Sequence, residues 1–91
     1  MAKFILTYET ADGFMEKVAE HFPAHTALWG EYQADGTLLM IGPFTDRSGA
    51  MGVFTTREAA ESFIGRDPFV EHGLVASHRI TEWEEVLFPV D

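Results

Sequence analysis

Apolar and polar positions follow two different periods along the chain, and the changes of period divide it into elements. Residues 3–8 alternate with a period of two, which predicts a strand with Phe4, Leu6 and Tyr8 on one side. Three further stretches have the apolar content and length of strands. They cover residues 38–41, 50–54 and 74–83.

Helical spacing appears first between the first and second strands. Apolar residues recur at this spacing from Phe14 to Phe22, until Pro23 removes a backbone donor. We expect a new helix to begin at Pro23, because a missing N–H costs nothing at the first helical position. Asp35 and Gly36 are expected to end that helix, since glycine suits a left-handed cap.

The second helical segment lies between the third and fourth strands. Thr55 and Glu58 have the spacing of a capping box and introduce it. We expect the helix to stop before Gly65, and Asp67-Pro68 keeps it from continuing. The predicted order is therefore βαββαβ.

This order predicts an α+β, ferredoxin-like fold, in which both helices cover one face of a four-stranded antiparallel sheet. Residues 38–41 are apolar on both sides of their strand, so the open face also needs a cover. We expect a second copy of the chain to provide it. The prediction is a single domain over residues 1–91 that forms a homodimer, a dimeric α/β barrel.

Composition removes several classes of function. The 15 acidic and 6 basic side chains give a net charge of -9, which argues against nucleic acid and anionic membrane surfaces as partners. The absence of cysteine excludes thiolate chemistry and disulfides. The chain begins without the pattern of a signal peptide and has no apolar run of membrane-spanning length, so we expect a cytoplasmic protein.

One histidine stands out as a candidate catalytic residue. In the helix that follows Pro23, an inward stripe at helical spacing consists of His25, Leu28, Trp29 and Tyr32. The two helices should pack antiparallel, which brings His25 close to Asp67. A carboxylate on one imidazole nitrogen fixes the tautomer and leaves the second nitrogen free for general acid–base catalysis.

Two other interpretations of these residues remain open. His25 can be a half-buried structural histidine, with Asp67 only capping a turn. His21 and His25 have a spacing that binds zinc on one helical face, but Pro23 lies between them and no third ligand is evident. We expect no metal and no cofactor, and we place His21 and His72 at the surface.

Further substrate contacts are predicted around His25. Gly42, Pro43 and Phe44 follow the second strand and are expected to form a pocket wall, although a simple strand end explains them equally well. Trp29 and Phe69 are predicted as additional binding residues, with the protein core as the alternative place for Trp29.

Three segments carry a resemblance to a known family. They are residues 21–25 (HFPAH), 36–44 (GTLLMIGPF) and 67–74 (DPFVEHGL), and in this order they resemble the YCII-related domain family. The resemblance implies a ferredoxin-like protein that dimerises as an α/β barrel, with a catalytic pair at His25 and Asp67. Relatives of similar fold include muconolactone isomerase-like proteins and a dehydrochlorinase that acts on a chlorinated hydroxyquinol.

The sequence thus predicts an enzyme that acts on a small organic molecule by proton transfer, through isomerisation or elimination, with His25 oriented by Asp67. One alternative is a non-catalytic module that binds a small molecule or a partner through the same pocket. Another is a monooxygenase of the same barrel architecture, without a cofactor or with haem.

Overall fold

The structure, a computed structural model, describes residues 2–86; residues 1 and 87–91 of the predicted domain lie outside this range. The elements, in chain order, are β1 (Ala2–Thr10), α1 (Phe14–Ala34), β2 (Leu38–Pro43), β3 (Gly49–Phe54), α2 (Arg57–Arg66), α3 (Pro68–Glu71) and β4 (Val75–Glu84). The order agrees with the prediction, with α3 as one additional turn. Within residues 2–86, no helix has the length and apolar content to cross a membrane.

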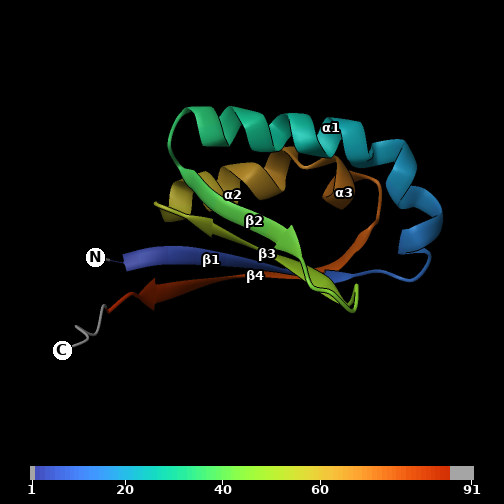
Figure 1. The fold of residues 1–91 in the computed structure, drawn as a ribbon. Helices are drawn as coiled ribbons and strands as arrows, with labels where there is room; N and C mark the ends of the chain where they lie inside the picture. Colours follow the sequence, from blue (N-terminus) through green and yellow to red (C-terminus); the bar gives the residue numbers. More distant parts are fainter. Residues whose placement is uncertain (1, 87–91) are drawn as a thin grey trace.

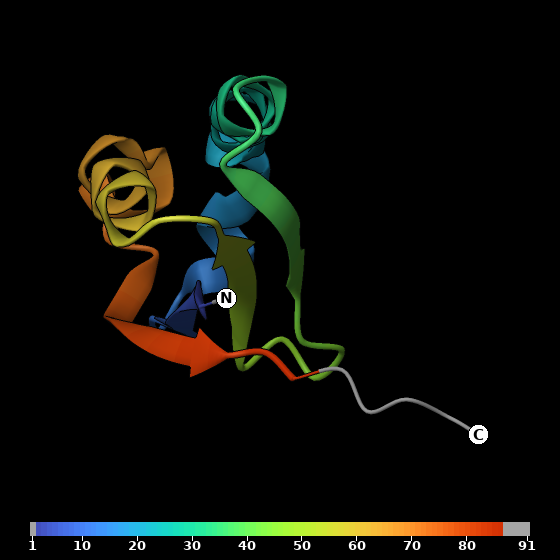
Figure 2. The same cartoon turned by 90° about the vertical axis from the view of Figure 1, so that its left-hand side faces the viewer.

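The four strands form one antiparallel sheet in the order β2-β3-β1-β4. Both long helices lie on the same face of it and run in opposite directions (Figure 1). The view from the side shows that this sheet is strongly twisted and that, among the residues described, no helix lies on its other face (Figure 2). The predicted α+β, ferredoxin-like fold is confirmed.

The core lies between the sheet and the helices. Alternation along β1 turns Leu6 and Tyr8 inward, where they meet apolar side chains from both helices. The other buried members of this cluster are Leu28, Tyr32, Leu38, Phe54, Ala60 and Phe63. Three aromatic rings at its centre, Tyr32, Phe54 and Phe63, pack with centroids 5.4 to 6.3 Å apart.

The open face of the sheet carries a row of apolar side chains. Val53 pairs with Ile5 on one side and with Met40 on the other, and directly opposite residues share a face. Met40 is 62% exposed, and Met51 and Trp83, on the same face, are also exposed. β2 thus has apolar side chains on both faces of the sheet, as predicted. That a partner chain covers the open face stays a prediction.

The expectation that a helix begins at Pro23 is wrong, because α1 is continuous from Phe14 and contains the proline. Pro23 has no N–H to donate to the Ala19 carbonyl. Both residues are exposed, so water can donate a hydrogen bond to that carbonyl instead. The Thr26 hydroxyl donates to the Pro23 carbonyl at 3.0 Å. Such bonds bend helices, and α1 is bent in its first half (Figure 1).

Two details of α2 also differ from the prediction. The N-cap is Thr56, not Thr55: its hydroxyl accepts a hydrogen bond from the Ala59 N–H at 3.1 Å, while the Thr55 N–H extends the pairing with β2. Gly65 does not end the helix, which continues to Arg66. The helix ends at Arg66, directly before Asp67-Pro68.

Candidate active site

Asp67 stands at the junction of α2 and α3. Because a proline disfavours the helical conformation in the residue before it, Asp67 is extended, with φ -73° and ψ 119°. Its Oδ1 accepts a hydrogen bond from the Phe69 N–H at 3.0 Å and caps α3. Asp67 is 1% exposed, so the protein itself must supply the hydrogen-bond donors for its carboxylate.

Two side chains from distant elements supply these donors. The Tyr8 hydroxyl on β1 donates to Asp67 Oδ2 at 2.7 Å, and His25 Nδ1 on α1 lies 2.6 Å from Oδ1. His25 is 5% exposed and occupies the middle of α1, not the first turn of a helix. The predicted approach of His25 to Asp67 is therefore present, and Tyr8 joins the pair as a third member.

The second imidazole nitrogen is not free, contrary to the prediction. The indole N–H of Trp29, one turn along α1, donates to His25 Nε2 at 3.1 Å. An indole nitrogen can only donate, so Nε2 is the unprotonated nitrogen and Nδ1 carries the proton that points to Asp67. This assigns His25 as a neutral imidazole with a fixed tautomer.

Aromatic neighbours hold the plane of the His25 ring. The Phe69 ring stacks on it with centroids 3.7 Å apart and an angle of 7° between the planes. Phe63 meets it edge-on at 6.2 Å, and Trp29 at 5.1 Å. Rotation of the ring would break the stacking and both hydrogen bonds, so the imidazole is held in one orientation.

Tyr8 remains a hydrogen-bond donor over a wide pH range. Burial raises the pKa of its phenol, and the adjacent Asp67 carboxylate raises this pKa further through its charge and its hydrogen bond. The phenol therefore keeps its proton at neutral pH and offers it to Asp67 Oδ2.

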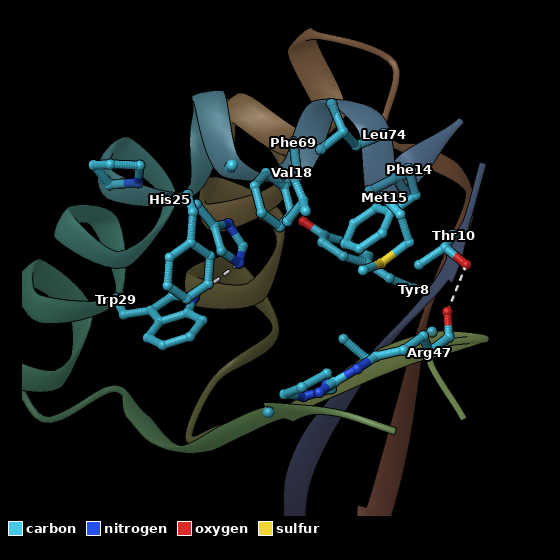
Figure 3. Close-up of a pocket in the computed structure, with 18 residues that line it drawn as sticks. Tyr8, Thr10, Phe14, Met15, Val18, His25, Trp29, Arg47, Phe69 and Leu74 are labelled. Atoms are coloured by element: carbon cyan, nitrogen blue, oxygen red, sulfur yellow. Dashed lines mark hydrogen bonds between the residues drawn. The ribbon is translucent and has the colours of Figure 1, made fainter. Parts of the chain in front are cut away.

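A cavity of about 570 Å³ opens beside the His25 imidazole (Figure 3). This volume is within the range of small-molecule sites. Its lining is mainly aromatic and aliphatic and includes Phe14, Met15, Val18, Phe22, Trp29, Phe69, Leu74 and Val75. The polar side chains among the lining residues belong to Tyr8, Thr10, His25, Trp29 and Arg47.

Most of the site residues predicted from the sequence lie around this cavity. Five of them line it: His25, Trp29, Gly42, Pro43 and Phe69. Asp67 is not among the lining residues, but it is hydrogen-bonded to two that are, His25 and Tyr8. Phe44 is not among the lining residues; it begins the β2–β3 turn and is 38% exposed.

Two residues and one hydrogen bond of the site were not foreseen. Tyr8 was recognised only as an inward residue of the first strand. The bond from Trp29 to His25 has a sequence signal, because residues four apart lie on one helix face. Arg47 has no such signal, because its position at the cavity depends on how the β2–β3 turn folds back.

His21 and His72 form a contact of their own. Their rings stack with centroids 4.0 Å apart, which joins α1 to α3, and His21 is half-buried and not at the open surface as expected. His21 Nε2 lies 3.0 Å from a Glu20 carboxylate oxygen. Within residues 2–86, no three histidine or acidic side chains are arranged to hold a metal ion.

The sequence identifies the family. The YCII-related domain matches residues 1–84. The chain belongs to the YCII-related domain family. No curated protein matches the sequence of this chain.

Solved structures share its architecture. One is 5-chloro-2-hydroxyhydroquinone dehydrochlorinase (TftG) from Burkholderia phenoliruptrix AC1100, in complex with 2,5-dihydroxybenzoquinone. It is 21% identical in sequence with a TM-score of 0.77, and the match covers 92% of this chain and 95% of that one. An antibiotic biosynthesis monooxygenase has 11% identity, TM-score 0.64 and coverages of 96% and 100%. PA3566 from Pseudomonas aeruginosa has 16% identity, TM-score 0.60 and coverages of 94%. At these identities the likeness establishes the fold.

Proposed function

We propose that this YCII-related domain is an enzyme that moves a proton on a small organic molecule, with His25 as general acid and base and Asp67 as its orienting partner. One observation carries the proposal: a neutral imidazole, held by a buried carboxylate, borders an apolar cavity of about 570 Å³. Perturbed or fixed titratable groups at an apolar pocket are typical of catalytic sites.

The pair suits isomerisation or elimination. His25 Nε2 would accept a proton from a C–H or O–H group of the substrate, and the Asp67 carboxylate would stabilise the imidazolium that results. In an isomerisation the same proton returns to another atom. In an elimination the leaving group departs with its bonding electrons as the proton is removed. The dehydrochlorinase named among the structural neighbours supports the second type.

Trp29 has to move before His25 can act. Nε2 has a single in-plane lone pair, which the Trp29 N–H occupies. We therefore expect an entering substrate to displace the indole. The emission of Trp29 should change on binding of 2,5-dihydroxybenzoquinone in a Trp83→Phe variant, where Trp29 is the sole tryptophan. An unchanged emission on saturating binding would contradict this step.

The test of catalysis uses chloride release from 5-chloro-2-hydroxyhydroquinone, together with proton exchange from D2O into a pool of unsaturated lactones. We expect His25→Ala to lower whichever of these two rates the wild-type protein shows by about 100-fold or more, the usual contribution of a general acid–base residue. Binding of 2,5-dihydroxybenzoquinone should largely survive. His78→Ala, a change at an exposed histidine on β4, is the matched control and should keep the rate.

The alternative is a module that only binds a small molecule. The apolar lining of the cavity and the capped Nε2 favour this second candidate. It would be supported if the wild-type protein binds the quinone but neither releases chloride nor exchanges protons. Equal rates for the wild type and His25→Ala would also reject His25 as the catalytic residue.

We propose, further, that the domain works as a homodimer that joins the open faces of two sheets. The support is the apolar row on that face, which includes Ile5, Met40, Met51 and Trp83. Light scattering of the wild-type protein should give twice the chain mass of 10.2 kDa. Met40→Glu should shift the particle to a monomer, and a monomeric wild type would contradict the proposal.

A further inference from the structure

Arg47 lies in the turn between β2 and β3, with its backbone held on both sides. Its N–H donates to the Phe44 carbonyl at 2.9 Å, and its carbonyl accepts from the Thr10 hydroxyl of β1, also at 2.9 Å. Its φ is +64°, the one positive value among the described residues other than glycine. A bulky residue in this conformation is uncommon; it occurs in turns, and such residues cluster at active and ligand-binding sites.

The guanidinium of Arg47 has no ion pair or hydrogen bond with any residue in the range 2–86. Of the five other basic side chains in this range, two are in ion pairs: Arg66 with Glu31 at 2.8 Å, and Lys3 with Glu85. Arg47 lines the cavity, and its extended side chain lies across from His25 and Trp29 (Figure 3).

Charge at the cavity is opposite in sign to that of the whole chain. The net charge is -9, yet among residues 2–86 no aspartate or glutamate lines the cavity, and Arg47 is the one lysine or arginine that does. A cavity that combines an apolar lining with one available cation selects for an apolar molecule with an anionic group.

We propose that the occupant of this cavity is a planar ring acid whose anionic oxygen is bound by Arg47, while its ring lies among Phe22, Trp29 and Phe69. A planar guanidinium binds oxyanions through two parallel N–H groups, and aromatic walls accept a flat ring. The anionic oxygen is a carboxylate or an ionised ring hydroxyl. This assignment rests on the proposed function, because it names the ligand class of the same site.

The test is calorimetric binding of two matched pairs of ligands. The first pair is naphthalene-2-carboxylate and its neutral carboxamide; the second is 4-nitrophenolate and 4-nitroanisole. We expect the wild-type protein to bind at least one anion about tenfold or more tightly than its neutral partner, the usual effect of a hydrogen bond to a charged group. The pair that shows the preference identifies the anionic oxygen.

Variants decide whether Arg47 is responsible. Arg47→Gln should reduce the preference for the anion to about one, with the binding of the neutral ligand unchanged. Arg57→Gln is the matched control: it removes the same charge from an exposed position at the start of α2, which is not among the lining residues, and should leave the preference intact. Thermal melts of both variants check that the fold is retained.

Three results would overturn the assignment: no anion preference in the wild type, equal losses in the two arginine variants, or no binding of any of these ring compounds. Failure of the proposed function is separable from these outcomes. His25→Ala should keep the anion preference, because the preference is a property of binding. An enzyme that processes neutral rings without any preference would uphold catalysis and reject Arg47 as the anion site.

Discussion

The rear and the mouth of the cavity are built differently. At the rear, Tyr8, His25 and Asp67 form a buried chain of hydrogen bonds, and no buried side-chain polar atom within residues 2–86 lacks a partner. At the mouth, Met15 is 66% exposed and Arg47 has no side-chain partner among the described residues. The rear orients one reactive group, whereas the mouth leaves side chains available to a ligand.

The largest effect should come from removing the carboxylate at the rear. Asp67→Ala leaves the Tyr8 hydroxyl, His25 Nδ1 and the Phe69 N–H without their acceptor in a buried place. We expect a loss of about 3–5 kcal/mol in the free energy of unfolding, because each of the three unmet buried donors costs about 1–3 kcal/mol. Urea denaturation measures it, with Asp67→Asn as the control.

The asparagine keeps an acceptor oxygen for His25 and should cost less than the alanine. If both variants are as stable as the wild type, the rear of the cavity is not the rigid part of the molecule and the contrast with the mouth fails.

A smaller loss is expected for Tyr8→Phe, which removes one donor to Asp67 Oδ2 and keeps the ring. The unmet carboxylate oxygen should cost about 1–3 kcal/mol in the free energy of unfolding. The same variant should also change how stability depends on alkaline pH.

The sign of that dependence follows from the raised pKa of Tyr8. Above its ordinary value of 10.0 the unfolded chain loses the phenol proton while the folded protein keeps it. The contribution of Tyr8 to stability is therefore complete below pH 10 and falls above it, by up to about 1.4 kcal/mol per pH unit. Between pH 9 and 11, the free energy of unfolding should fall more steeply with pH in the wild type than in Tyr8→Phe. Equal slopes would argue against a buried phenol.

Pro68→Ala tests how the junction of α2 and α3 positions the carboxylate. Without the proline, the chain can continue α2 through Asp67, which would turn the carboxylate away from His25. We expect a loss of about 1 kcal/mol in stability, and a larger proportional loss of any activity. A variant with equal losses in both would favour a purely structural role for the junction.

The smallest effect on stability should come from the mouth. Met15→Ala removes an exposed side chain on α1 and should change the free energy of unfolding by no more than about 0.5 kcal/mol. Its effect should appear in ligand binding, because Met15 lines the cavity. A stability loss as large as that of Tyr8→Phe would mean that the mouth belongs to the folded core.

The sequence by itself determined the features that depend on local spacing. Alternation in β1 predicted Leu6 and Tyr8 on the inner face, and helical spacing predicted His25 on the buried side of α1. The Asp67-Pro68 pair predicted the end of α2, because proline restricts the residue before it. Such features need only the chain within one or two turns.

Tertiary structure decided the features that depend on packing between distant segments. The helix continues through Pro23, because packing of the residues after it stabilises α1 by more than one lost hydrogen bond costs. The expected antiparallel packing of the two helices predicted that His25 lies near Asp67, but only the packed core placed the Tyr8 hydroxyl on the same carboxylate and the Trp29 indole on Nε2. The turn that carries Arg47 to the cavity likewise depends on its bond to Thr10, 37 residues away, which no local pattern records.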